Sequence, residues 1–193
     1  GELSPQLFPQ DMLAAVFKAL PAKISSLNYL EARGLAELRE SLVQRLASRG
    51  INVKPSNILI TSGSLQALQL ISVGMLKPGA QVYTETPTYL KSLQVFQSAG
   101  ISFTGIAMDK NGLVPWKIGK VPNGSLLYTI PTYQNPTTLV MTVERRREVF
   151  DFCSKHRLPI LEDDAYGELH FDGNTPPLPI KALDDSGVVL YTG

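Results

Sequence analysis

The 193-residue sequence has few of the residues that many specialised sites and scaffolds require. Its single cysteine, Cys153, excludes an internal disulfide framework and a CxxC metal site. His156 and His170 have no recognisable metal-ligand partner in the sequence, so we expect no metal. The net charge of +1 comes from 18 basic and 17 acidic residues, which indicates no basic surface for nucleic acid. No apolar run approaches the roughly 20 residues that span a bilayer, and no signal peptide is visible. We therefore expect a soluble, cytoplasmic protein with no membrane partner.

Strand and helix patterns alternate along most of the chain. Runs of apolar and β-branched residues predict five strands at Asn57–Thr61, Gln81–Glu85, Ser125–Ile130, Leu158–Asp163 and Val188–Thr192. Helical spacing is found over residues 35–46, 65–76 and 143–156, and the second of these is apolar on nearly every face, as in a helix buried on several sides. This alternation predicts an α/β three-layer sandwich, with a mostly parallel sheet between layers of helices.

The first 28 residues differ from the rest. Three prolines, Pro5, Pro9 and Pro21, punctuate one short amphipathic helix from Gln10 to Leu20. We expect residues 1–28 to form an arm or a piece of a smaller domain, and residues 29–193 to form the main domain. Within the main domain, we expect Arg145–Arg146–Arg147 to be a solvated helix face and Cys153 a core residue.

Polar and turn-forming residues follow the predicted strands, where ligands of open α/β sheets bind. At Thr61–Ser62–Gly63–Ser64, Gly63 allows a tight turn and Ser64 can cap the next helix, whose free amides favour a phosphate or carboxylate. A plain helix cap is the alternative. Walker A and GxGxxG spacings are missing, which argues against ATP and dinucleotides.

The acidic triplet Glu162–Asp163–Asp164 ends an apolar predicted strand. Three interpretations are open: a charge cluster in a loop, a magnesium site, or a carboxylate paired with a cationic ring nitrogen. Thr86 and Asn135 each precede a proline, so both peptide bonds are candidates for the cis form, and the fixed polar side chains suit a pocket wall.

Taken together, these segments resemble the class I/II aminotransferases, whose fold is the fold-type-I pyridoxal-phosphate-dependent transferase fold. The resemblance extends to the MocR/GntR-type regulators, which join this domain to a winged-helix DNA-binding module. It runs from Gly1 to Gly193. It rests on L-F-P, Y-L-E-A-R-G-L-A-E-L-R, I-T-S-G-S-L-Q-A-L, E-T-P-T-Y, Y-Q-N-P-T and L-E-D-D-A-Y-G-E-L, in that order.

The resemblance implies a set of pyridoxal 5'-phosphate contacts. It assigns Ser64 and the amides of Ser64 and Leu65 to the phosphate, Tyr89 to the ring face, Asn135 and Tyr166 to the phenolic oxygen, and Asp163 to the pyridine nitrogen. Asp164 is the second choice for the nitrogen. Tyr29 would reach the phosphate of a partner subunit in a homodimer, and Gly34 would lie near the substrate carboxylate.

The sequence departs from the family pattern at three places. Leu65 stands where many relatives have glutamine, and Thr138 replaces the usual glycine after Asn-Pro-Thr. The Schiff-base lysine is expected just after Gly193, and neither Lys155 nor Lys181 occupies its position. We therefore expect this chain to be an incomplete major domain with no catalytic residue of its own and no aminotransferase activity alone.

The leading hypothesis for the full-length parent is amino-group transfer between an amino acid and a 2-oxo acid. The second is a cofactor-binding effector domain of a transcriptional regulator, which would contact DNA only through an upstream domain. A lyase or synthase using the same cofactor and a cofactor-free binding module are the remaining alternatives.

Overall fold

Residues 4–22, 29, 31–169, 173 and 175–193 are described by a computed structural model of the chain. The chain divides into two units, Gly1–Arg33 and Gly34–Gly193. The first contains the 3-10 helices η1 (Pro5–Leu7) and η2 (Leu20–Ala22) and the helix α1 (Gln10–Ala19), which confirms the helix expected there. Of the arm expected over residues 1–28, positions 1–3 and 23–28 lie outside the described residues.

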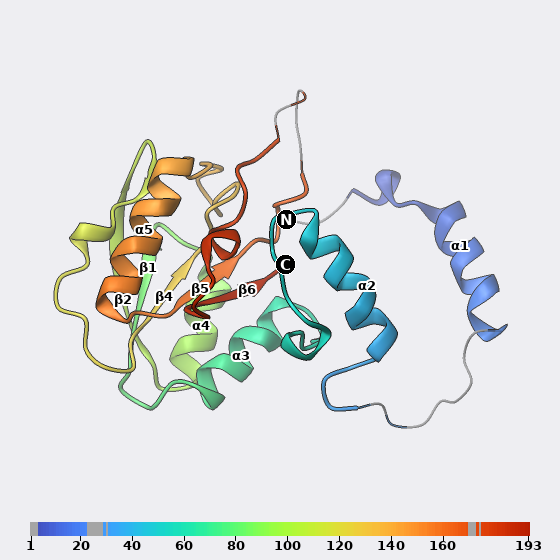
Figure 1. The fold of residues 1–193 in the computed structure, drawn as a ribbon, viewed down its shortest axis with the longest axis horizontal. Helices are drawn as coiled ribbons and strands as arrows, with labels where there is room; N and C mark the ends of the chain where they lie inside the picture. The colour runs from blue at the N-terminus through green and yellow to red at the C-terminus, as the bar shows by residue number, and fades with distance from the viewer. Residues whose placement is uncertain (1–3, 23–28, 30, 170–172, 174) are drawn as a thin grey trace. The chain divides into compact units, whose positions relative to one another are not determined.

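The second unit is built on a six-stranded sheet with the order β3-β2-β1-β4-β5-β6 (Figure 1). The strands are β1 (Gln81–Thr86), β2 (Ser102–Asp109), β3 (Gly112–Leu113), β4 (Leu126–Thr129), β5 (Ile160–Asp163) and β6 (Val189–Thr192). All neighbouring pairs are parallel except β2 and β3. The mostly parallel sheet is therefore confirmed.

Helices cover both faces of this sheet, as the three-layer prediction requires (Figure 1). The helices of this unit are α2 (Ala36–Ala47), α3 (Ser64–Gly74), α4 (Leu90–Ser98) and α5 (Val143–His156), with short 3-10 helices η3 (Pro55–Asn57), η4 (Pro115–Lys117) and η5 (Ile180–Leu183). None of the helices in the described part of the chain is long and apolar enough to cross a bilayer.

Alternate residues of β1, β4, β5 and β6 contribute to two hydrophobic clusters, one on each face of the sheet. On one face, Val149 and Cys153 of α5 join a cluster with Leu127 and Ile160, which confirms Cys153 as a core residue. On the other face, Leu68 of α3 and Phe96 of α4 join a cluster with Leu126 and Leu161. A strand buried on both faces explains why β4 and β5 read as continuous apolar runs.

One of the five predicted strands is wrong. Pro55–Asn57 form η3, and residues 58–61 pair with no strand among the described residues, although Ile58 has extended backbone angles. An apolar β-branched run becomes a strand only where a neighbour accepts its ladder of hydrogen bonds. Leu59 remains 52% exposed, so this segment lacks the cover that β4 and β5 have.

The sequence pattern missed β2, which lies between β1 and the two-residue edge strand β3, and the helix α4. Only Ile106 of β2 is buried, so the strand lacks the apolar run that marks the central strands. Gly105 in its middle is required by close packing, because a Cβ there would collide with the side chain of Thr86 on β1.

Two expectations about helix faces are also corrected. Only Leu68 and Ser72 of α3 are buried, while Leu70 and Val73 are 44% and 60% exposed, so α3 is covered on one side rather than several. The arginine run on α5 is a solvated face only at Arg147, because Arg145 and Arg146 are only 4% and 2% exposed. The core residue Val149 lies four residues after Arg145 and three residues after Arg146, so all three share one side of α5.

Candidate functional site

The strand order reverses between β1 and β4, and this reversal defines where a ligand would bind. β2 follows β1 on one side and β4 lies on the other, which makes the β1–β4 crevice the topological switch point of the sheet. The carboxyl ends of these strands and of β5 bring together Glu85, Thr129 and Asp163, which are all buried. The chain thus places a group of buried polar side chains where open α/β sheets bind their ligands.

Asp163 has one carboxylate oxygen satisfied and one left open. Its Oδ2 accepts a hydrogen bond of 2.7 Å from the Tyr128 hydroxyl. Its Oδ1 is buried and has no hydrogen-bond partner within the described residues. Burial raises the pKa of Asp163, against the hydrogen bond from Tyr128, which lowers it. A buried carboxylate in this state is suited to a cationic partner supplied by a ligand.

Asp164 already has such a cation in the protein. Its Oδ2 lies 2.8 Å from Nη2 of Arg49 and accepts a 2.8 Å hydrogen bond from the Tyr191 hydroxyl. Gly167 leaves room for this group, because a Cβ there would collide with Asp164 and Arg49. The third acid of the triplet, Glu162, accepts from the backbone N–H groups of η5, and the described residues hold no cluster of three potential metal ligands. Oδ1 of Asp164 also has no hydrogen-bond partner among the described residues, but the charge of Asp164 is paired with Arg49. Asp163 is therefore the acid of the triplet for which the structure shows no paired cation among the residues that it describes.

Glu85 is a buried acid that the sequence interpretation did not single out. Its Oε1 accepts from the hydroxyl of Thr129 and, at 2.9 Å, from the backbone N–H of Ile130, which joins the ends of β1 and β4. Its Oε2 is buried with no partner among the residues described, and burial raises its pKa to about 7. The sequence does contain a signal for Glu85, because this residue is the single acid at the end of an otherwise uncharged buried strand.

The helix α3 begins at Ser64, one residue earlier than a capping serine allows. Gly63 takes the cap position with φ +88°, and no side chain caps this helix. The expected Ser64 cap is therefore wrong, because Ser64 itself is the first helical residue. The first helical bond runs from the N–H of Ala67 to Gly63, so the amides of Ser64 and Leu65 precede the helical ladder. These amides and the helix dipole form a ready site for an anion.

The remaining predicted residues lie on separate segments. Tyr89 is the N-cap of α4 and packs against the cluster that contains Phe96. Asn135 and Tyr166 are both half-buried, on the segments that follow β4 and β5. Tyr29 belongs to the first unit and is fully exposed. Gly34 has φ +88°, and a Cβ there would meet Ile60 at 2.6 Å.

The segment 131–141, here called the Asn135 loop, joins β4 to α5. Both peptide bonds expected as cis candidates, Thr86–Pro87 and Asn135–Pro136, are cis. Gln134 links the two segments, since its side-chain amide donates a 2.9 Å bond to the backbone oxygen of Pro87. Tyr133 and Thr138 have φ +49° and +62°, a region that side chains with a Cβ rarely adopt. The loop is therefore strained at two positions.

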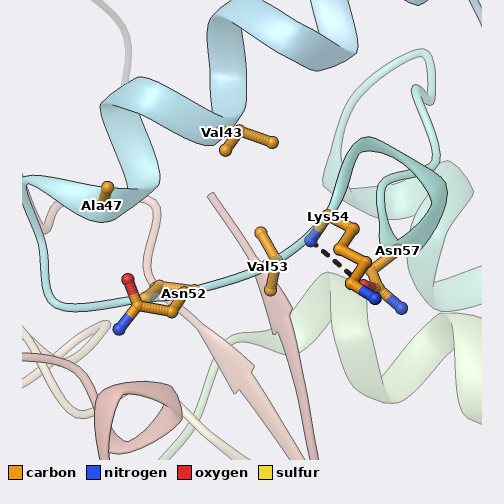
Figure 2. A pocket seen from close by; sticks show the side chains of 7 residues that line it. Val43, Ala47, Asn52, Val53, Lys54 and Asn57 are labelled. Carbon is orange, nitrogen blue, oxygen red and sulfur yellow. Dashed lines mark hydrogen bonds between the residues drawn. The ribbon is translucent and has the colours of Figure 1, made fainter.

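Two other features do not contribute to this site. Lys181 donates bonds of 2.8 Å each to Asp184 and to the backbone oxygen of Val189, so its ammonium has a structural role. A hollow of about 380 Å³ lies between α2 and the segment that follows it, lined by Val43, Ala47, Ile51, Asn52, Val53, Lys54 and Asn57 (Figure 2). It contains none of the residues at the strand ends.

This arrangement defines an open α/β domain with a candidate binding site at its switch point, and the comparisons place the domain among known proteins. Residues 5–192 match the family of class I and II aminotransferases, so the chain belongs to that family. The curated relatives include both enzymes and regulators. The chain is 46% identical to an uncharacterised HTH-type transcriptional regulator, YisV of Bacillus subtilis, and 34% identical to aromatic-amino-acid aminotransferase 1 of Thermococcus litoralis.

These matches cover the whole of this chain but 40% and 49% of the two relatives. Among solved structures, the kynurenine aminotransferase of Pyrococcus horikoshii superposes with a TM-score of 0.85 at 35% identity, over 97% of this chain and 49% of that one. That structure is a complex with PMP, KYN as substrates and KYA as products. The chain thus spans half or less of these relatives, and pyridoxal phosphate is the cofactor of its class.

The strained backbone at Thr138 generates the first prediction. Glycine adopts a positive φ without steric cost, so Thr138→Gly should raise the free energy of unfolding by about 1 kcal/mol. Thr138→Ala keeps the Cβ and should recover less than half of this gain. Urea unfolding of the three proteins measures the difference. Equal stability of the glycine and threonine forms would show that the loop stores no strain at this position.

The second prediction concerns the buried acid at the switch point. Because burial raises the pKa of Glu85 from 4.5 to about 7, the folded chain holds this proton more tightly than the unfolded chain does. The resulting stabilisation is complete below about pH 4.5 and is lost as the pH rises through 7, by up to about 3 kcal/mol. Glu85→Gln should remove this share of the pH dependence.

Unfolding free energies between pH 5 and pH 8 provide the measurement. Glu162, whose pKa burial also raises to about 7, should keep its own share in the Glu85→Gln protein. Glu40→Gln makes the same chemical change on the exposed side of α2 and is the matched control for the substitution itself. A Glu85→Gln profile parallel to that of the wild type would mean that Glu85 is ionised in the fold.

Proposed function

We propose that the switch-point site binds pyridoxal phosphate and that the whole protein uses it to transfer an amino group between an amino acid and a 2-oxo acid. The observation that carries this proposal is the open, buried Oδ1 of Asp163. A carboxylate there would pair with the protonated pyridine nitrogen, while the Tyr128 hydroxyl holds the other oxygen in place.

The other contacts follow from the matching motifs. Asn135 and Tyr166 would donate to the phenolic oxygen, Tyr89 would stack on the ring, and Ser64 with the amides of Ser64 and Leu65 would hold the phosphate. When bound, the cofactor supplies an electron sink that stabilises negative charge on the substrate. Gly34, which has no side chain to obstruct a ligand, would lie at the substrate carboxylate.

A second copy of the chain is part of this proposal. Tyr29 is fully exposed and would reach the phosphate in the partner subunit of a homodimer. An uncovered apolar surface on α3, which includes Leu70 and Val73, supports association of two copies.

The third prediction tests the assignment of Asp163. In the whole protein, Asp163→Asn should raise the dissociation constant of pyridoxal phosphate by at least about tenfold, because it leaves a buried pyridinium without its counter-charge. Asp164→Asn should instead lower the free energy of unfolding and change cofactor affinity by less than about threefold, because Asp164 already pairs with Arg49. Titration with pyridoxal phosphate, followed by visible absorbance, measures both affinities. The reverse ranking of the two variants would transfer the role to Asp164.

A regulatory role is the second candidate, and the observation that favours it is the 46% identity to an HTH-type transcriptional regulator. In that case the same site would bind the cofactor as an effector, and DNA would be contacted by a domain outside residues 1–193. The net charge of +1 gives this chain no overall excess of positive charge with which to attract DNA.

The fourth prediction separates the two candidates in the whole protein. For the enzyme we expect turnover of an amino acid with a 2-oxo acid, and no retention of duplex DNA from its own promoter in a gel. Retention of that DNA without turnover would favour the regulator if pyridoxal phosphate also shifts the protein concentration at which half of the DNA is retained. The Asp163→Asn variant is the control for both assays, because it should abolish the turnover or the shift.

A further inference from the structure

A buried arginine on α5 lies beneath the candidate site without belonging to it. Arg146 is 2% exposed and makes four hydrogen bonds, none of them to a residue assigned to the cofactor. Burial of a guanidinium is expensive unless each of its donors finds an acceptor. The acceptors therefore show which segments this side chain holds.

Three of the four acceptors lie at the two ends of the Asn135 loop. Nη2 donates to the backbone oxygen of Pro131 at 2.9 Å and to the hydroxyl of Thr132 at 3.0 Å. Nε donates to the backbone oxygen of Met141 at 3.0 Å, and the N–H of Met141 bonds back to Pro131 at 2.8 Å. One guanidinium thus closes the base of the loop that carries Asn135.

The same side chain is linked to the strand that carries Asp163. Nη1 of Arg146 lies 3.8 Å from Oε1 of Glu162, the residue before Asp163 on β5. The Glu162 carboxylate also accepts 2.8 Å bonds from the backbone N–H groups of Ile180 and Lys181. Neighbouring residues of a strand point to opposite faces, so this network supports the sheet from the face opposite to Asp163.

The Asn135 loop contains two strained residues, so its conformation depends on contacts such as the hydrogen bonds from Arg146. Left-handed backbone at Tyr133 and Thr138 is unfavourable for residues that have a Cβ, and it persists only where surrounding contacts impose it. Hydrogen bonds from a charged group are stronger than those between neutral groups, so the bonds from Arg146 are suited to impose it. Lysine has three donors and no planar fork, so it could not reach both ends of the loop in the same way.

We propose that Arg146 is a positioning residue for the cofactor site: by clamping both ends of the strained loop it holds Asn135 where the phenolic oxygen binds. This inference rests on the proposed function only for the identity of the ligand. It assigns Arg146 no contact with the cofactor.

Arg145 provides a matched control on the same helix. It is also buried, at 4% exposed, and it donates to Asp109 and to the backbone oxygens of Gly112 and Leu113, at the β2–β3 edge of the sheet. Arg145→Lys and Arg146→Lys therefore make the same chemical change in two buried networks. Only the second network includes the Asn135 loop.

The first measurement is amide hydrogen exchange of the protein without cofactor. In Arg146→Lys, peptides covering residues 131–141 should exchange about tenfold faster, while Arg145→Lys should accelerate exchange only near residues 109–113. Thr132→Val removes a single acceptor and should produce a smaller change in the same loop if Arg146→Lys does not fold. Unchanged loop exchange in Arg146→Lys and Thr132→Val, or equal acceleration in the Arg145 variant, would overturn the proposal.

The second measurement is cofactor binding by the whole protein. Arg146→Lys should raise the dissociation constant of pyridoxal phosphate about tenfold. It should also move the pH at which the bound cofactor changes its visible absorbance, in the same direction as the variant Asn135→Ala, which is measured alongside it. Arg145→Lys should lower stability and leave that pH unmoved. An unmoved pH in Arg146→Lys would reduce Arg146 to a stabilising residue and overturn the proposal. Wild-type protein that binds no cofactor would refute the proposed function, while the exchange result would still decide whether Arg146 holds the loop.

Discussion

Burial of carboxylates at the carboxyl ends of β1 and β5 is the constraint on which the rest of this domain depends. Removing an ionised group from water is costly, so each buried acid needs donors or a cation from the surrounding chain. Glu85 obtains them from the end of β4, Glu162 from η5 and Arg146, and Asp164 from Arg49 and Tyr191. These partners come from almost every element around the sheet, and satisfying them fixes how the loops leave it. Asp163 differs from the other two acids of β5 and its end, because the described residues supply Glu162 and Asp164 with an arginine but give Asp163 only the hydroxyl of Tyr128.

Because neighbouring residues of a strand point to opposite faces, the side chains that would bind a ligand lie on one face of the sheet, and the side chains that position the site lie on the other. Tyr128 and Asp163 lie on the sheet face covered by α3 and α4, where α3 also presents its open N-terminus. Glu162 and Arg146 lie on the α5 face, where they bond to backbone rather than to open space. A ligand on one face can therefore be held by groups that are shaped from the other face.

Much of this organisation could be predicted from the sequence, because central strands and helices buried on one side leave strong periodic signals. Val143–His156 was predicted with its observed bounds, and four of the five predicted strands exist. The failures have physical causes. Residues 58–61 have the composition of a strand but pair with no strand among the described residues, and β2 has only one buried residue. Neither pairing nor exposure is written in a local pattern.

The candidate site was also predicted only in part, because sequence motifs mark the residues at the strand ends and not the residues that support them. The motifs gave the residues that follow the strands, and the resemblance selected Asp163, but the groups beneath them were missed. Arg146 was assigned to solvent because it stands in a run of three arginines. Its distance from Val149 and Cys153, three and seven residues along the helix, places it on the core side. A charged residue at core spacing indicates a buried network, which charge counting alone does not reveal.

The cost of the strained backbone, compared with the strength of the hydrogen bonds from Arg146, explains how the Asn135 loop tolerates a threonine at position 138, where the resemblance implies a glycine. The left-handed conformation of Thr138 costs of order 1–3 kcal/mol, and Tyr133 adds a similar amount. Three hydrogen bonds from the buried guanidinium of Arg146 reach the ends of the loop, and at about 1.5–3 kcal/mol each they match or exceed that cost. The geometry of the loop is therefore determined by the contacts at its base rather than by the conformational preferences of the residues within it. A change at position 138 then alters the stability of the domain, whereas a change at Arg146 alters the shape of the site.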